Sequence, residues 1–160
     1  RSADLRKEIL GPTHPATARA IFNLSRLNFD LGQVAQAQRD FDELARLLPD
    51  MPADQDTVLR ARILELSLLD EAGEGAVALS RLEQLSTDLE KLSGERFDEL
   101  RAQLKLQAGT MYAQRGDAEQ ALRFFEEGLA IRLARYGADH YLVEDARAQA
   151  QSAGIVLPST

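Results

Sequence analysis

Apolar and polar residues follow one another along this chain with the spacing of amphipathic helices. The segment at 21–28 reads IFNLSRLN, and segments with apolar residues at the same steps begin at 63 (ILELSLLD) and 105 (KLQAGTMY), 42 and 84 residues later. Apolar positions three and four residues apart are typical of a helix with one buried face. No segment alternates with period two, so the pattern predicts an all-α chain without strands.

Glycines divide the predicted helices into pairs. Gly32, Gly73 and Gly116 each follow one of the three segments, and glycine just past a helix end adopts the left-handed conformation without steric cost. After each glycine comes a second helical pattern, in which a small residue is followed four positions later by a large one. These pairs are Ala37 with Phe41, Ala78 with Leu82, and Ala121 with Phe125. We expect close helix packing at these steps, with both phenylalanines buried.

The pattern predicts eight helices, as a partial helix, three pairs and a last single helix. Their ranges are 1–10, then 15–31 with 34–48, 57–72 with 75–92, 96–115 with 118–136, and finally 141–153. The repeats thus cover 15–48, 57–92 and 96–136, within a single array over 1–160. The chain begins inside the second helix of a pair and not with Met, so we expect a fragment of a longer protein.

Both ends of the chain carry the same period. LGPTHP at 10–15 recurs as YGADHY at 136–141, an offset of three repeats, and this places His14, Asp56, Asp98 and His140 at helix starts. Pro15 suits a first helical turn, and aspartate suits an N-cap. We therefore expect Asp56 and Asp98 to cap their helices.

Two glycines fall inside predicted helices. Gly109 shares its repeat position with Ser25 and Ser67, which indicates a packing site where two helices nearly touch. Similar crowding is the only explanation that the sequence offers for Gly128.

Composition and charge narrow the functional classes. The net charge is −7, with 19 Lys and Arg scattered among 26 acids, whereas nucleic-acid recognition needs a clustered basic surface. Cysteine is absent, which excludes thiolate chemistry and fits a reducing compartment. No apolar run approaches the roughly 20 residues of a membrane span. We expect a cytoplasmic protein that binds neither nucleic acid nor membrane.

The repeat resembles the tetratricopeptide repeat family, whose pattern is Leu-Gly-x-x-Tyr, then Gly, then Ala-x-x-x-Phe, then Pro. The 42-residue spacing, with LGPTHP before the first helix, looks like the kinesin-light-chain type. Similar arrays occur in bacterial multidomain signalling proteins and beside Ser/Thr protein kinase domains. The resemblance implies a solenoid of antiparallel helix pairs that forms a right-handed superhelix. The matching residues are Leu24, Ser25, Gly32, Ala37, Phe41 and Pro49 in the first repeat, and Gly109, Tyr112, Gly116, Ala121 and Phe125 in the third.

The resemblance also implies a site, because in the family the first helices of the pairs line a concave groove that holds peptides. Asn23 follows an apolar pair, as does the groove asparagine that hydrogen-bonds a peptide backbone in kinesin-light-chain-type repeats. Arg19 and Arg26 share a helix face and would favour acidic side chains. The alternative is that these residues have no binding role and only form the solvated sides of amphipathic helices. The candidate groove residues are Arg19, Asn23, Arg26, Asp30, Glu65, Leu68, Gln103, Gln107, Thr110 and Gln114.

We therefore expect a protein-interaction module without catalytic residues, cofactor or metal. The two histidines lie at opposite ends of the array and no thiol accompanies them. One alternative is a structural, dimerisation or regulatory domain of a multidomain signalling protein. Another is a piece of an enzyme whose chemistry lies in the missing part. Exposed Leu5 or Ile9 near the start predicts weak self-association through the chain ends.

Overall fold

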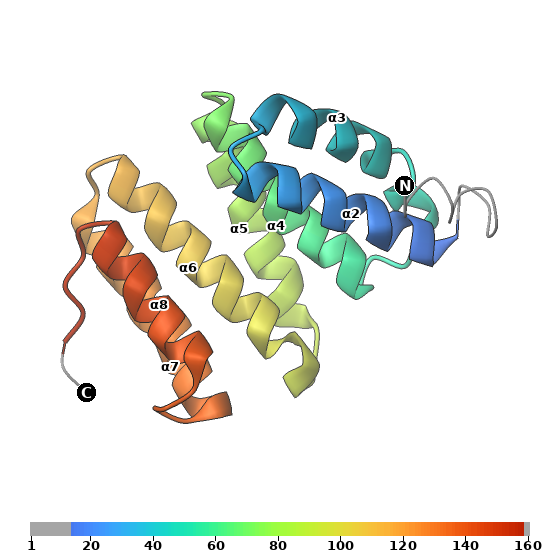
Figure 1. Cartoon of the computed structure of the whole chain (residues 1–160). Helices are drawn as coiled ribbons and strands as arrows, with labels where there is room; N and C mark the ends of the chain where they lie inside the picture. Colours follow the sequence, from blue (N-terminus) through green and yellow to red (C-terminus); the bar gives the residue numbers. More distant parts are fainter. Residues whose placement is uncertain (1–13, 159–160) are drawn as a thin grey trace. The chain divides into compact units, whose positions relative to one another are not determined.

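The computed structural model describes residues 14–158, and every regular element in this range is helical (Figure 1). Two short 3-10 turns, Leu48–Asp50 (η1) and Glu95–Phe97 (η2), precede α4 and α6. The expected helix at 1–10, with Leu5 and Ile9, lies outside the described residues. The helices are α2 (Pro15–Asp30), α3 (Val34–Ala45), α4 (Asp56–Glu71), α5 (Gly75–Lys91), α6 (Asp98–Gln114), α7 (Ala118–Tyr136) and α8 (Tyr141–Ser152).

The seven predicted helices after residue 14 are confirmed, with small differences at their ends. The helix expected at 34–48 ends at Ala45, and the chain then tightens into the turn Leu48–Asp50. Pro49 fits this difference, because proline has no backbone N–H with which to continue the helical hydrogen bonds, and it lies in the first residues of the 3-10 turn.

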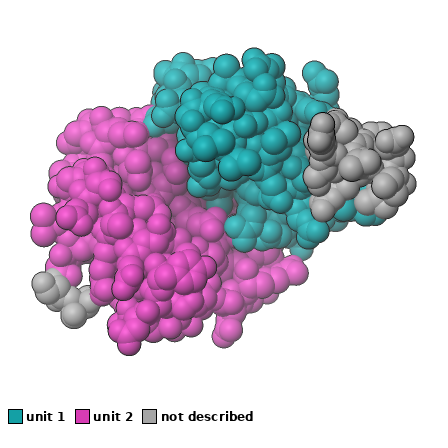
Figure 2. Space-filling view, in the orientation of Figure 1, with its two compact units in different colours: residues 1–78 teal, residues 79–160 magenta. Residues whose placement is uncertain are grey.

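The chain divides into two compact units, residues 1–78 and 79–160, which are described separately (Figure 2). In unit 1, α2 packs on α3, and both helices contact α4. The boundary falls within α5. The arrangement of both units as one array over 1–160 stays a prediction. The core of unit 1 consists of Ala18, Ile21, Ala37, Phe41, Leu44, Ala61, Leu64 and Leu68.

In unit 2, α6 and α7 form an antiparallel hairpin and α8 contacts both helices (Figure 1). Phe125 is fully buried in this core, as predicted, and Phe41 is buried in that of unit 1. Ile155 and Leu157, in the segment that follows α8, also pack on the unit 2 core. The buried residues of this core are Leu106, Phe125, Leu129, Val143, Ala146 and Ala150.

The predicted glycine turns are confirmed. Gly32, Gly73 and Gly116 have φ angles of +74°, +78° and +79°. Each glycine N–H donates to the carbonyl three residues earlier, and the next N–H donates to the carbonyl five residues before it. This is the Schellman motif, which satisfies the last carbonyls of a helix. Gly154, with φ of +75°, makes the same turn after α8.

Gly109 marks a close approach of two helices, as predicted. A Cβ atom placed there would lie 2.8 Å from a ring carbon of Phe125 on α7. Gly128 is the reciprocal site on α7, where a Cβ would lie 2.9 Å from the side chain of Leu106 on α6. The pair of glycines therefore lets α6 and α7 pack more closely than any side chain would allow.

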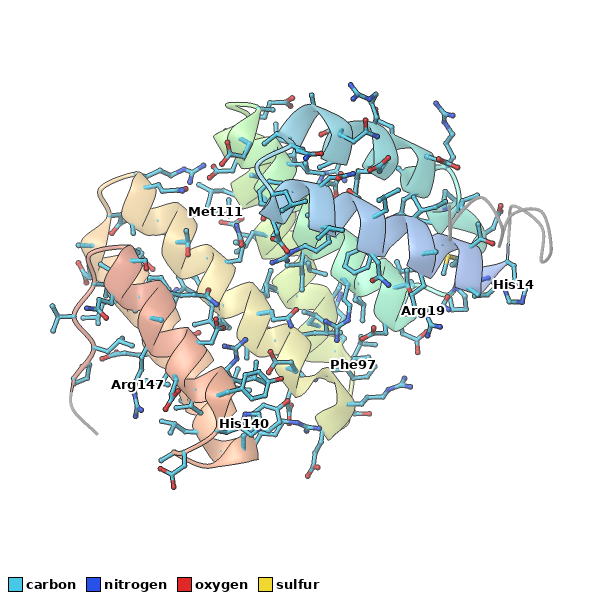
Figure 3. The ribbon with its side chains drawn as sticks, viewed as in Figure 1. His14, Arg19, Phe97, Met111, His140 and Arg147 are labelled. Atoms are coloured by element: carbon cyan, nitrogen blue, oxygen red, sulfur yellow. The ribbon has the colours of Figure 1, made fainter. Side chains whose placement is uncertain are left out.

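The histidines cap their helices through side-chain atoms, and Figure 3 shows them at the starts of α2 and α8. Nδ1 of His14 accepts a hydrogen bond from the Ala16 N–H at 3.1 Å, and Nδ1 of His140 accepts one from the Leu142 N–H at 3.3 Å. Pro15 occupies the first helical position, as predicted.

The prediction that Asp56 and Asp98 are N-caps is wrong. Each is the first residue inside its helix, and the residues before them make no side-chain cap. Asp56 instead accepts from Nε of Arg60 at 2.7 Å, and Asp98 accepts from Arg101 at 2.8 Å. The ion pairs stabilise these carboxylates in the first helical turn, where the helix dipole also favours negative charge.

Candidate functional site

A groove with a volume of about 630 Å³ lies between α6 and α8 in unit 2. Its walls combine three alanines with two hydroxyls, two amides and one carboxylate. Small side chains leave the backbone accessible, and the polar groups around it can pair with another chain. The lining residues are Thr110, Ala113, Gln114, Asp145, Ala148, Gln149, Ser152 and Ala153.

Two of these residues, Thr110 and Gln114, were predicted as groove residues from the sequence. They lie four residues apart on α6 and therefore on the same side of the helix. The Thr110 hydroxyl donates to the Leu106 carbonyl at 3.2 Å, and Gln114 is exposed in the last turn.

The opposite wall, on α8, is not among the predicted groove residues, because the sequence pattern indicates only a single last helix at 141–153. The signal was nevertheless present, since the three polar residues of this wall each lie one 42-residue period after a predicted groove residue, and Asp145 follows Gln103. Gln149 follows Gln107 at this distance, and Ser152 follows Thr110. Extending the alignment of the polar groove positions by one more repeat would have identified these residues of the second wall.

Asp145 is the charged residue among those that line the groove, and its carboxylate is already engaged. Its Oδ2 atom accepts from Arg132 on α7 at 2.8 Å and from the Gln149 amide at 2.8 Å. These contacts reduce the negative charge that Asp145 presents and fix the Gln149 side chain along the wall.

Arg132 holds the two walls at a fixed spacing. Its side chain is 3% exposed and forms a second ion pair, at 2.8 Å, with Glu99 on α6. It also donates to the Leu142 carbonyl at 2.7 Å. A single buried guanidinium thus connects α6, α7 and α8. Glu99 and Arg132 each keep one buried polar atom without a hydrogen bond, so breaking this cluster would strand more buried charge.

The other residues predicted on α6 are not part of this groove. Gln103 and Gln107 are half-buried, and neither belongs to the lining set. The Gln103 amide donates to Glu99 at 3.3 Å, so this side chain supports the ion cluster described above.

On α2 of unit 1, Arg19, Asn23, Arg26 and Asp30 are exposed, as groove residues should be. Nε of Arg26 pairs with the Asp30 carboxylate at 2.9 Å, and both side chains are about half exposed, 52% and 51%. This pair weakens the expected attraction of Arg26 for acidic side chains of a partner, because its charge is balanced within the same helix.

The two candidates on α4 differ in their exposure. Glu65 is half-buried. Leu68 is 3% exposed and belongs to the core of unit 1, so the expectation that it lines a groove is wrong. The prediction placed Leu68 by its repeat position alone. At this position α4 directs an apolar side chain into the core.

A second hollow of about 600 Å³ lies beside the ends of α6 and α7, near Glu95 and Asp98. Arg135 crosses it and donates to the Glu95 carbonyl at 2.6 Å. The pKa of Arg135 is raised above its usual value, chiefly by its hydrogen bond with Tyr136. This hollow contains no residue predicted as a site, and its arginine is engaged in fastening η2 to α7.

Within residues 14–158, no group of three or more His, Cys, Asp or Glu side chains is placed to hold a metal ion. Over the same range, no helix is both long and apolar enough to cross a bilayer.

Residues 102–141, which run from α6 through α7 to the first residue of α8, match the model of the tetratricopeptide repeat family. No curated protein matches the chain. Tetratricopeptide repeats stack as helix pairs and generally serve as non-catalytic protein-interaction modules. Over these residues, and in its helix-pair fold, the chain is thus similar to the tetratricopeptide repeat family.

Proposed function

We propose that the groove between α6 and α8 binds a peptide segment of a partner protein. The observation that carries this proposal is the combination of a 630 Å³ groove with amide and hydroxyl groups on both walls. Thr110 and Gln114 stand on one side, and Gln149 and Ser152 stand on the other.

The chemistry of the groove suits a peptide backbone. An amide side chain both donates and accepts hydrogen bonds, so it can pair with the N–H and C=O groups of any peptide. Ala113, Ala148 and Ala153 are small enough for a peptide chain to approach the helices closely. Such contacts recognise a backbone rather than a sequence, so the adjacent charges must supply selectivity.

The charge of the groove favours an uncharged or basic segment. No Lys or Arg is among its lining residues, and Asp145 is its carboxylate. The preference for acidic side chains predicted from Arg19 and Arg26 concerns α2 in unit 1. There Asn23 stays the proposed contact to a peptide backbone. Arg19, on the same helix, would supply the positive charge, because the charge of Arg26 is balanced by Asp30.

The alternative is a dimerisation or regulatory role within a multidomain signalling protein, such as one that carries a Ser/Thr kinase domain. One observation favours it, namely that Leu24 and Leu27 on α2 are 41% and 54% exposed. A kinesin-light-chain-like type, a bacterial signalling parent and a cytoplasmic location also stay predictions that rest on the resemblance.

The test is a selection of peptides from a displayed library on the wild-type chain, followed by titration of the selected peptides against variants. Ala148 is an exposed residue of the groove wall, so Ala148→Arg fills the groove without disturbing the core. We expect this variant to lose at least about tenfold in affinity. Gln149→Ala should weaken binding by about 0.5–1.5 kcal/mol, the usual contribution of a neutral hydrogen bond.

The matched control is Ala130→Arg, because Ala130 is an exposed alanine of α7 in the same unit but outside the groove. This variant should bind the selected peptides as the wild type does. Peptides that bind Ala148→Arg and the wild type equally well would show that the groove is not the binding surface.

A further inference from the structure

The polar side chains of the α6–α8 groove have used more of their donors than of their acceptors. The Thr110 hydroxyl donates to the Leu106 carbonyl at 3.2 Å, so its oxygen can still accept a hydrogen bond from a ligand. The Gln149 amide donates to Asp145 at 2.8 Å, and its carbonyl oxygen remains as an acceptor. These side chains therefore suit a ligand group that carries several N–H donors.

The ion cluster behind the groove keeps one negative charge. Within residues 14–158 its one cation is Arg132, which pairs at 2.8 Å with both Glu99 and Asp145. The side chain of Glu99 is 16% exposed, whereas that of Asp145 is 47% exposed. Asp145 is also the member of the cluster that lines the groove. The excess negative charge is therefore accessible to a ligand at Asp145.

The hydrogen bonds of Asp145 discriminate between the two common basic side chains. Its Oδ2 atom already accepts from Arg132 and from Gln149, and its Oδ1 atom has no hydrogen-bond partner among the residues that the structure describes. An arginine binds a carboxylate best when its fork meets both oxygens. A lysine ammonium has three donors on one atom, so it needs a single carboxylate oxygen and can reach neighbouring acceptors.

The carboxylate is particular to this wall of the groove and not a property of the repeat. The residues that lie 126, 84 and 42 positions before Asp145 are Arg19, Ala61 and Gln103. None of them is acidic. Arg147, which is close to Asp145 in the sequence, is not a lining residue, so it does not balance the charge inside the groove.

We propose that the α6–α8 groove takes a lysine side chain of the bound peptide and that Asp145 determines this specificity. The inference rests on the proposed function and names the residue that the groove selects in the partner. The ammonium binds Oδ1 of Asp145, and the oxygens of Thr110 and Gln149 accept its other N–H groups. Because Arg132 balances part of the charge, the gain in affinity is that of a partly exposed ion pair, roughly threefold to fivefold.

The test uses four displayed peptide libraries that differ at one fixed central position, which is Lys, Arg, Gln or Glu. All other positions are random among uncharged residues, and the recovery of each library on the chain is measured. We expect the Lys library to be recovered roughly three to five times better than the Gln library, with Arg between them and Glu lowest. Equal recovery of Lys and Gln overturns the proposal, and so does better recovery of Arg than of Lys.

Two variants assign the preference to a residue. Asp145→Asn removes the charge but keeps an oxygen that can accept from Arg132, and it should abolish the preference for Lys over Gln. The matched control is Glu144→Gln, because Glu144 is an exposed acid of α8 that does not line the groove, and this variant should keep the preference. The preference is a ratio measured on one protein, so a moderate loss of folded protein does not change it. An equal loss in both variants would show that overall charge sets the preference, and would overturn the proposal.

The variant Ala148→Arg separates the failure of this inference from the failure of peptide binding. Recovery of the Gln library that Ala148→Arg abolishes, without a preference for Lys in the wild type, would overturn the inference and leave the proposed function standing. Recovery that Ala148→Arg leaves unchanged in every library would overturn both.

Discussion

The contact between Gly109 and Phe125 makes a quantitative prediction about the packing of unit 2. In Gly109→Ala, the new Cβ would lie 2.8–2.9 Å from three atoms of the Phe125 ring. Phe125 is 0% exposed, so the ring has no open space into which it can move. Two effects of the substitution therefore compete.

Helix propensity favours alanine over glycine by about 1 kcal/mol, whereas overpacking a core costs about 1–3 kcal/mol. We expect overpacking to dominate and Gly109→Ala to lower the free energy of unfolding by up to about 2 kcal/mol. Phe125→Leu should lower it by an amount on the order of 1–2 kcal/mol, because it leaves a small cavity. In the double variant the alanine methyl occupies the space that the ring has left. Its loss of stability should therefore be smaller than the sum of the two single losses, by about 1 kcal/mol or more.

The assay is urea unfolding followed by far-ultraviolet circular dichroism on all four proteins of this cycle. Gly109→Ala combined with Phe41→Leu serves as the control, because Phe41 lies in the core of the other unit. The losses of stability caused by these two substitutions should add up to within about 0.5 kcal/mol. If Gly109→Ala raised stability, or if its effect simply added to that of Phe125→Leu, the two helices would not be in the close contact described here.

Three other predictions test single features of the fold by the same unfolding assay. Arg132→Ala should lower the free energy of unfolding by about 3–5 kcal/mol, because it leaves Glu99 as a buried charge without its partner. Adding Glu99→Gln should recover part of this loss. A loss no larger than that of a surface arginine would contradict the role of the ion cluster. His140→Ala should cost about 1 kcal/mol through loss of the N-cap, while His140→Asn should stay close to wild type, and equal stability of both variants would argue against the cap. Ser25→Ala should cost about 1 kcal/mol, because the buried hydroxyl donates to the Ala37 carbonyl at 2.8 Å, and an unchanged midpoint would show that this hydrogen bond contributes nothing.

Most of the fold could be predicted from the sequence because its determinants are local. A glycine after an amphipathic segment specifies both the end of one helix and the left-handed turn that follows, and this held at Gly32, Gly73 and Gly116. The spacing of Ala121 and Phe125 likewise predicted which side of α7 is buried. Each of these inferences needs only residues a few positions apart.

Features that depend on two competing partners were harder to predict. Asp56 has the side chain of an N-cap, yet the arginine four residues later binds it inside the first turn. Leu68 has the repeat position of a groove residue but an apolar side chain, and burial in the core of unit 1 determined its place. In both cases the repeat position was correct and the local chemistry decided the outcome.

The candidate site could be predicted only in part, because its two walls and its support come from distant segments. Thr110 and Gln114 were found, but the wall on α8 required the repeat to be extended past the last predicted pair. Arg132 could not be assigned at all, since its partner Glu99 lies 33 residues away in the sequence. Only the packing of three helices brings these charges together.

The glycine turns have a practical consequence for anyone who alters this chain. At Gly32, Gly73 and Gly116 three residues separate the two helices. By contrast, ten residues separate α3 from α4, six separate α5 from α6 and four separate α7 from α8. The first kind of connection has a fixed length, because both of its hydrogen bonds and its left-handed residue must be kept. The second kind varies in length within one protein, so extra residues, labels or protease sites are best inserted there. In the longest connection the place for them is 52–54, which is exposed, because Leu47, Leu48 and Met51 pack on the core of unit 1.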